Sequence, residues 1–151
     1  MIEFSMTSCS LTESDLKEVE RRFGFTFPAA IRRHYLRYNG GHPVRNRFVD
    51  ENGTCIVHDF FPIKLSNAPT LGTLEDCITS VKMERSLIPA HLIPLANDPS
   101  GNFYCFSVRQ EDNGSIYWVP MDGRSKKAEY LAPSLDAFMS KLISKPRVME
   151  R

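Results

Sequence analysis

The histidines are the residues of this chain best suited to chemistry, and their spacing does not assemble a reactive site. His34, His42, His58 and His91 are scattered, and none has a second histidine or a cysteine at metal-ligand spacing. His58 precedes Asp59, which could orient its imidazole, but a surface histidine beside an acid is more often incidental. The GxSxG, P-loop, GxGxxG, HExxH and EF-hand motifs are all missing from the sequence. We therefore expect no catalytic residue, no cofactor and no metal, and we expect that the protein is not an enzyme.

The cysteines and the composition indicate a cytoplasmic domain. The 4 cysteines are far apart and form no CxxC pair, so we expect reduced thiols, with Cys105 inert in the core. A formal net charge of +1 provides no overall field to attract nucleic acid or a membrane. The first residues lack the pattern of a signal peptide, and no apolar run is long enough to span a bilayer. We therefore expect a cytoplasmic protein with no membrane partner, and we favour a monomer.

A cluster of polar side chains between two apolar runs could be taken for a cation site. Asn97, Asp98 and Asn102 offer oxygens, but one carboxylate is too few for tight calcium binding. Asp98-Pro99-Ser100-Gly101 is instead typical of a type I turn, with a positive φ at Gly101. We expect a hairpin here. Its second strand is apolar on both faces, which places it in the middle of a sheet.

Charge is distributed unevenly along the chain. Between residues 21 and 47 there are seven arginines and no acidic residue, and Arg33 and Arg37 project from the same side of a predicted helix. The following stretch is dominated by five acids: Asp50, Glu51, Asp59, Glu75 and Asp76. The two regions are either solvated faces whose charges balance, or docking surfaces for partners of opposite charge.

The elements that position these residues are predicted from local signals. Helices are expected from Thr12, which forms a capping box with Asp15, to Gly24, and from Pro28 to the Asn39-Gly40-Gly41 stop. Two more begin after the N-caps Thr73 and Ser134, and the second of them continues through Ile143 to a stop at Pro146. Strands are expected over 47–49, 54–57, 59–63, 115–119 and 128–131, besides the two strands of the hairpin.

The order of these elements predicts one α+β domain over residues 11–145. Helices would pack on a twisted, mainly antiparallel sheet of about five or six strands. Residues 1–10 are expected to form a flexible N-terminal tail, and residues 146–151 a frayed C-terminal tail.

Five motifs occur in a fixed order along the chain. They are Phe27-Pro28, YLRYNGG over 35–41, DFFPI over 59–63, IPLAND over 93–98 followed by Gly101-Asn102, and GSIY over 114–117. Together they resemble the SUKH superfamily, which groups bacterial toxin-immunity proteins with fungal Smi/Knr-type regulators of cell-wall assembly. The resemblance covers about residues 11–142. It assigns structural roles to Pro28, Asn39, Gly40, Gly41, Asn97, Asp98, Gly101 and Asn102.

The resemblance implies a non-enzymatic domain that neutralises a cognate toxin, often a nuclease or deaminase, by direct binding. A basic toxin would dock on the acids Asp50, Glu51, Asp59, Glu75 and Asp76, and an acidic toxin on Arg33 and Arg37. One alternative is an interaction adaptor of the regulator branch, which has no toxin. Another, which we consider improbable, is a nucleic-acid-binding module that uses the Arg21–Arg47 region.

Overall fold

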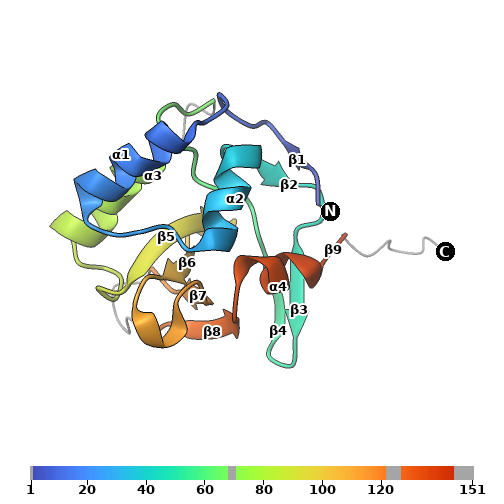
Figure 1. Ribbon diagram of the computed structural model, residues 1–151. Coiled ribbons are helices and arrows are strands. Elements are labelled where there is room, and N and C mark those ends of the chain that lie inside the picture. The colour runs from blue at the N-terminus through green and yellow to red at the C-terminus, as the bar shows by residue number, and fades with distance from the viewer. Residues whose placement is uncertain (1, 68–70, 122–126, 145–151) are drawn as a thin grey trace.

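The computed structural model of this protein describes residues 2–67, 71–121 and 127–144. Within these residues the fold consists of helices and three small antiparallel sheets (Figure 1). The helices are α1 (Glu13–Phe23), α2 (Ala29–Arg37), α3 (Leu74–Cys77), which continues as a π-helix over Ile78–Glu84, and α4 (Leu135–Ser140). The strands are β1 (Phe4–Ser5), β2 (His42–Pro43), β3 (Arg47–Asp50), β4 (Gly53–Ile56), β5 (Leu92–Asn97), β6 (Phe103–Ser107), β7 (Ile116–Val119), β8 (Glu129–Ala132) and β9 (Leu142–Ile143). A 3-10 turn over Gln110–Asp112 precedes β7.

The α+β class is confirmed, and the strands are divided among separate sheets. The largest sheet has the order β5-β6-β7-β8, a second has the order β4-β3-β9, and β1 pairs with β2. Strand β6 lies inside the largest sheet, as its apolar faces predict, and Tyr104, Cys105 and Phe106 on it are fully buried. Burial raises the pKa of the Cys105 thiol far above its ordinary value, which makes this cysteine a core residue rather than a nucleophile.

The β5–β6 turn has the predicted conformation. Asp98 Oδ1 accepts hydrogen bonds from the amides of Ser100 and Asn102, each at 2.9 Å, and Gly101 has a φ of +87°. The second carboxylate oxygen accepts a 3.1 Å bond from Trp118 Nε1 on β7. Asp98 therefore shapes the turn and also ties it to the neighbouring strand.

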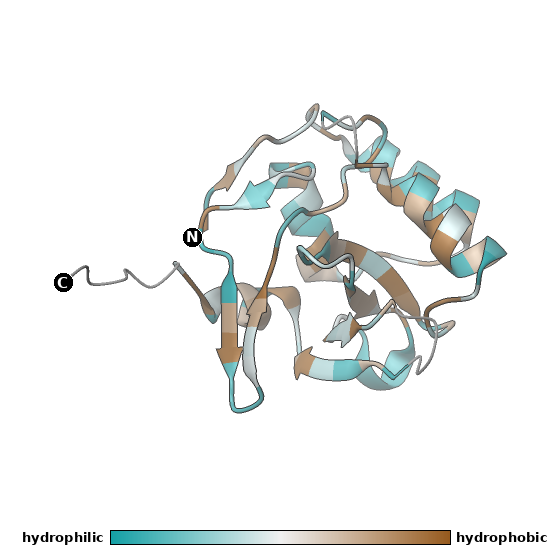
Figure 2. Cartoon of the chain, turned by 180° about the vertical axis from the view of Figure 1, so that it is seen from behind, coloured by the Kyte–Doolittle hydropathy of each residue, from teal (hydrophilic) through white to brown (hydrophobic). Residues whose placement is uncertain are grey.

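The helix starts agree with the capping signals. Thr12 with Asp15, and Thr73 with Asp76, form reciprocal capping boxes, and the Ser134 side chain caps α4. Helix α1 ends at Gly24, as expected. Figure 2 shows hydrophilic and hydrophobic residues interspersed along the helices, and on α1 the hydrophobic Leu16 and Val19 are buried.

The segment after α2 is held by one buried side chain. Asn39 is 3% exposed, and its Nδ2 donates to the carbonyls of Cys9 (2.9 Å) and Ile63 (2.8 Å). Its Oδ1 accepts from the Ile63 amide at 2.7 Å. A Cβ on Gly40 would lie 2.8 Å from Pro62 Cβ, and one on Gly41 would lie 2.5 Å from the Ser5 carbonyl oxygen. The Asn39-Gly40-Gly41 motif is thus a junction where three chain segments meet.

The N-terminal residues take part in the fold, in contrast to the flexible tail expected over residues 1–10. Phe4 pairs with Pro43 in the β1–β2 ladder, and Ile2 is only 5% exposed. Phe4 also contacts the rings of Tyr38 and Phe60. The sequence before Thr12 shows no alternation, so nothing local indicates this pairing. The predicted C-terminal tail, residues 146–151 with the helix stop at Pro146, lies outside the described residues, as does the segment 122–126.

Three predicted elements differ from the structure. Helix α4 ends at Ser140, and Leu142–Ile143 forms β9, in which Leu142 pairs with Phe48 of β3. The apolar positions that continue the helical pattern are instead used by a strand. The predicted strand over 59–63 is reduced to Phe60, which bridges Gly41 and Ala96 without forming a ladder. Pro28 is the residue before α2 rather than its first residue.

Replacing Gly101 by valine should destabilise the protein by about 1–3 kcal/mol, since a β-branched residue resists positive φ. Nothing lies within 4 Å of a Cβ built here, so the cost is conformational. Gly101→Asn, which tolerates positive φ better, should cost clearly less in chemical denaturation. Equal losses for both variants would show that φ is not the cause.

Replacing Asn39 by alanine should lower the free energy of unfolding by about 3 kcal/mol or more, because the two buried backbone groups of Ile63 and the partly buried carbonyl of Cys9 lose their partner. Urea denaturation measures the loss. The exposed Asn52, whose side chain bonds only to Glu129 among the described residues, serves as the control. Asn52→Ala should change stability by about 0.5 kcal/mol or less. A comparable effect of the two substitutions would contradict the role assigned to Asn39.

Candidate functional site

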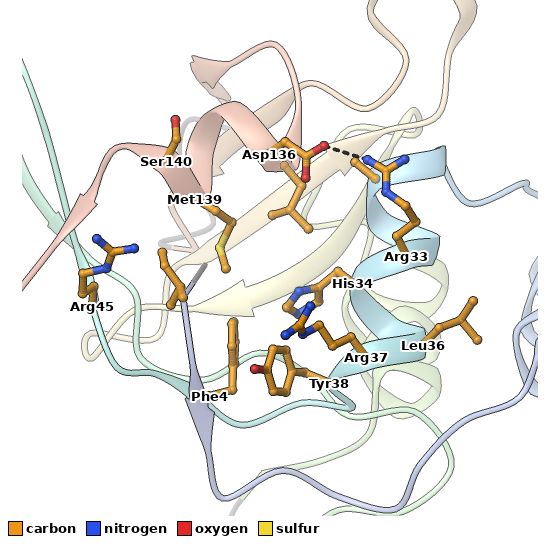
Figure 3. A pocket seen from close by; sticks show the side chains of 13 residues that line it. Phe4, Arg33, His34, Leu36, Arg37, Tyr38, Arg45, Asp136, Met139 and Ser140 are labelled. Atoms are coloured by element: carbon orange, nitrogen blue, oxygen red, sulfur yellow. Dashed lines mark hydrogen bonds and ion pairs between the residues drawn. The ribbon is translucent and has the colours of Figure 1, made fainter.

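A groove of about 970 Å³ lies between α2 and α4 and reaches the N-terminal strand (Figure 3). Its apolar wall includes Phe4, Leu135 and Met139, and its charged residues are Arg33, Arg37, Arg45 and Asp136. Arg45 comes from the loop between β2 and β3, so four chain segments contribute to the groove. Apolar and charged side chains both line this groove.

Helical periodicity explains how the groove is lined. Ala30, Arg33, His34 and Arg37 recur at intervals of three and four on α2, so they share one face. Ile31 and Tyr35 occupy the opposite, buried face, where the Tyr35 hydroxyl donates to the Phe61 carbonyl at 2.8 Å. Apolar packing on one side of α2 thus presents its basic side to α4.

The charges around the groove are only partly neutralised. Arg33 on α2 donates to Asp136 on α4 at 2.7 Å, with both side chains more than half exposed. The Arg37 guanidinium lies 5.5 Å from the Tyr38 ring centre, a cation–π contact. Within residues 2–67, 71–121 and 127–144, neither Arg37 nor Arg45 has a carboxylate partner. The groove therefore retains two unpaired positive charges.

His34 is a polar residue inside this largely apolar wall. Its ring centre lies 4.8 Å from that of Phe4 and 4.9 Å from that of Phe60. Its Nε2 atom is shielded from solvent and has no hydrogen-bond partner among the described residues. Burial lowers the pKa of His34 to about 4, against a smaller opposing effect of the Asp136 carboxylate. The imidazole is accordingly neutral at pH 7 and retains an unused hydrogen-bonding atom.

Acid should destabilise the protein partly through His34. The unfolded histidine binds a proton at a pKa of about 6.5 and the folded one at about 4, so stability falls as the pH is lowered between these values. His34→Leu should remove up to about 3 kcal/mol of this loss. Urea denaturation of both proteins at pH 7.5 and pH 4 provides the comparison, and curves that fall in parallel would contradict it.

Three of the seven arginines form ion pairs among the described residues. Arg21 pairs with Glu18, Arg32 pairs with Glu13 and Glu20, and Arg33 pairs with Asp136. Arg22 lies over the Phe23 ring, and Arg47 has a buried nitrogen without a partner among the described residues. The region from residue 21 to 47 therefore does not form one free basic surface. Of the two predicted partner residues on α2, Arg37 is the one that remains unpaired.

The predicted acidic residues do not come together on one face. Asp50 and Glu51 lie at the β3–β4 hairpin, whereas Glu75 and Asp76 lie on α3, across the molecule in Figure 1. Asp50 accepts from the Asn52 amide at 2.9 Å, and Glu75 accepts from the Lys64 amide at 3.0 Å. Asp76 caps its own helix. Most of these carboxylates therefore stabilise local backbone.

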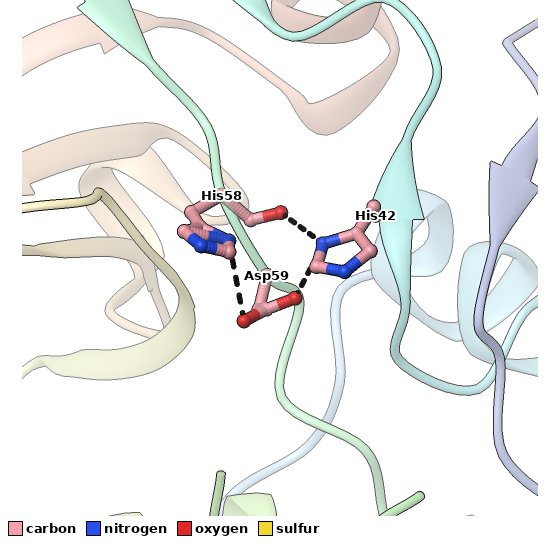
Figure 4. Close-up of side chains that lie close together, drawn as sticks. All are labelled: His42, His58 and Asp59. Carbon is pink, nitrogen blue, oxygen red and sulfur yellow. Dashed lines mark hydrogen bonds and ion pairs between the residues drawn. The ribbon is translucent and has the colours of Figure 1, made fainter. Parts of the chain in front are cut away.

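Asp59 belongs to a cluster that the sequence does not reveal (Figure 4). Its Oδ1 lies 2.6 Å from His42 Nδ1, and its Oδ2 lies 3.3 Å from His58 Nδ1. The backbone of Asp59 is fixed by Asn97, whose Oδ1 accepts from the Asp59 amide at 2.9 Å. The antiparallel bridge between Gly41 and Phe60 brings His42 to this position, and no local signal in the sequence indicates it.

The same three residues are the one group among the described residues with suitable metal-ligand atoms within 4.8 Å of one another. His42 Nδ1 also lies 3.0 Å from the His58 carbonyl oxygen. A carbonyl oxygen only accepts, so Nδ1 carries the proton and donates to it. A metal ion bound at this nitrogen would have to displace the proton and the hydrogen bond to the His58 carbonyl. The observed arrangement is therefore a close His–Asp–His cluster in which His42 is engaged with the backbone.

Helices packed on antiparallel sheets, with a buried Asn-Gly-Gly junction and a hairpin turn shaped by Asp98, make this an α+β domain. The comparison with family models identifies its family. The SMI1/KNR4 family (SUKH-1) model matches residues 10–141, and the chain belongs to this family. No curated protein matches the chain. Among the described residues, no helix has both the length and the apolar character needed to cross a membrane.

Proposed function

We propose that this protein is an immunity protein that neutralises a bacterial toxin by direct binding in the cytoplasm, without catalysis of its own. Membership of the SUKH-1 family supports this function, because the superfamily includes toxin-immunity proteins. The motif residues Asn39, Asp98 and Gly101 are committed to the fold, so partner recognition falls to other side chains.

The observation that carries the proposal is the groove between α2 and α4. It combines an apolar wall with the unpaired Arg37 and Arg45. Apolar area supplies affinity in protein interfaces, and charge around it supplies specificity and speed of association. The engaged arginines elsewhere in the region 21–47 make nucleic acid a poorer candidate, since a phosphate backbone requires a continuous run of free cations.

Co-expression with the toxin encoded beside its gene should restore growth, and the two proteins should purify as a complex. Arg37→Glu with Arg45→Glu should reduce the affinity for the toxin at least tenfold, because two attractive charges become repulsive. Titration calorimetry on the purified pair measures the affinity. Lys17→Glu with Arg22→Glu is a control with the same change in charge, since both residues are exposed on α1, outside the groove.

Failure of the unaltered protein to protect against any toxin encoded by a neighbouring gene, together with the lack of a complex, would contradict the immunity proposal. The second candidate is an interaction adaptor, which the SMI1/KNR4 description of the family favours. An adaptor would have no adjacent toxin gene, and endogenous signalling or envelope proteins would be recovered with it from its own cells.

A further inference from the structure

We infer that the groove binds an acidic segment of a partner protein, one that inserts a large apolar side chain beside Met139 and places carboxylates on Arg37 and Arg45. This inference rests on the proposed function and specifies the chemistry of the partner at the groove. Three observations carry it: the shape and apolar lining of the groove, the unpaired arginines, and the unsatisfied nitrogen of His34.

The volume and lining of the groove indicate that a partner inserts a side chain into it rather than covering it as a flat surface. A volume of about 970 Å³ exceeds that of any single residue, and Phe4, Leu135 and Met139 offer it an apolar surface. Methionine adapts its shape to aromatic and aliphatic partners. Helix-lined apolar grooves commonly receive anchoring side chains from a partner segment. The groove therefore fits an aromatic or long aliphatic side chain with the backbone on either side of it.

The arginines determine the charge of that segment. Arg37 and Arg45 approach the groove from α2 and from the β2–β3 loop, and Figure 3 shows them on different sides of Phe4. Both are exposed and have no carboxylate partner among the described residues. The planar guanidinium favours two-point bonding to a carboxylate. An acidic residue on each side of the apolar anchor would satisfy this arrangement.

The apolar wall and His34 favour a protein over a phosphate-bearing ligand. Asp136 on the edge of the groove is paired with Arg33, which leaves Arg37 and Arg45 free to bind carboxylates. His34 is neutral and has one shielded nitrogen, so it can bond a backbone or side-chain polar group of a peptide that reaches the floor. A polypeptide supplies apolar, acidic and amide groups within a few residues.

Selection of random dodecapeptides displayed on phage against the immobilised full chain tests the inference without a known toxin. Peptides should be enriched in Asp and Glu beside Leu, Phe or Trp. A selected peptide, synthesised with a fluorescent label, should bind at least tenfold more weakly to Arg37→Glu with Arg45→Glu and to Met139→Glu. It should bind equally to the Lys17→Glu, Arg22→Glu control. Circular dichroism confirms that each variant is folded.

Peptides without acidic enrichment, or binding that the groove variants leave unchanged, would overturn the inference. Displacement of the peptide by single-stranded dT12 at similar concentration would also overturn it, in favour of a phosphate ligand. The two proposals can fail separately. If the double variant R37E/R45E protects against the toxin as well as the unaltered protein does, the immunity function stands and the groove is not its binding site.

Discussion

The buried amide of Asn39 is the interaction on which the rest of this structure depends. It binds Cys9 before α1 and both backbone groups of Ile63, so one side chain joins segments that are far apart in the sequence. The backbone carbonyl of Asn39 also accepts from the Ser8 amide. An amide side chain suits this position because it donates and accepts at once, and water cannot replace it in a buried site. Neither a carboxylate nor an apolar side chain could satisfy all of these groups.

The positions of the residues that line the groove depend on the Asn39-Gly40-Gly41 junction. Helix α2 ends two residues before Asn39, so the hydrogen bonds of Asn39 fix where Tyr38 and the last turn of α2 lie. Phe4 stacks on Tyr38 with ring centres 5.0 Å apart, and the close approach of Ser5 to Gly41 lets the N-terminal strand reach this position. The apolar wall and the exposed arginines are thus held by a buried polar network that does not itself contact the groove. The residues that hold the fold together are therefore distinct from those that line the groove.

Features determined by neighbouring residues were predictable from the sequence. The capping boxes at Thr12 and Thr73 and the turn at Asp98 depend on side chains within four residues of the backbone they bind. The order of the motifs also identified the family, which its match over residues 10–141 confirms. The α+β class follows from the order of the elements, because each element must cover its apolar face with another.

Features that depend on distant pairing were not predictable. His42 lies beside Asp59 because Gly41 pairs with Phe60, and the ion pair between Arg33 and Asp136 becomes evident only when α4 is placed beside α2. The helical pattern that continues to Ile143 was misleading for the same reason, since β3 offers Leu142 a hydrogen-bonding partner that the pattern cannot show. The seven arginines between residues 21 and 47 could not be distinguished in the sequence. Their tertiary contacts show which of them are paired with carboxylates.

The pairing of β9 with β3 has a consequence for how the protein is made. Strand β3 lies between β4 and β9, so its second edge is unpaired until residues 142 and 143 have left the ribosome. The Phe48 ring, stacked on Phe138, likewise has no partner until residue 138 has been made. The domain can therefore close only after residue 143 has emerged, and an arrested chain ending at residue 141 would expose a strand edge open to aggregation.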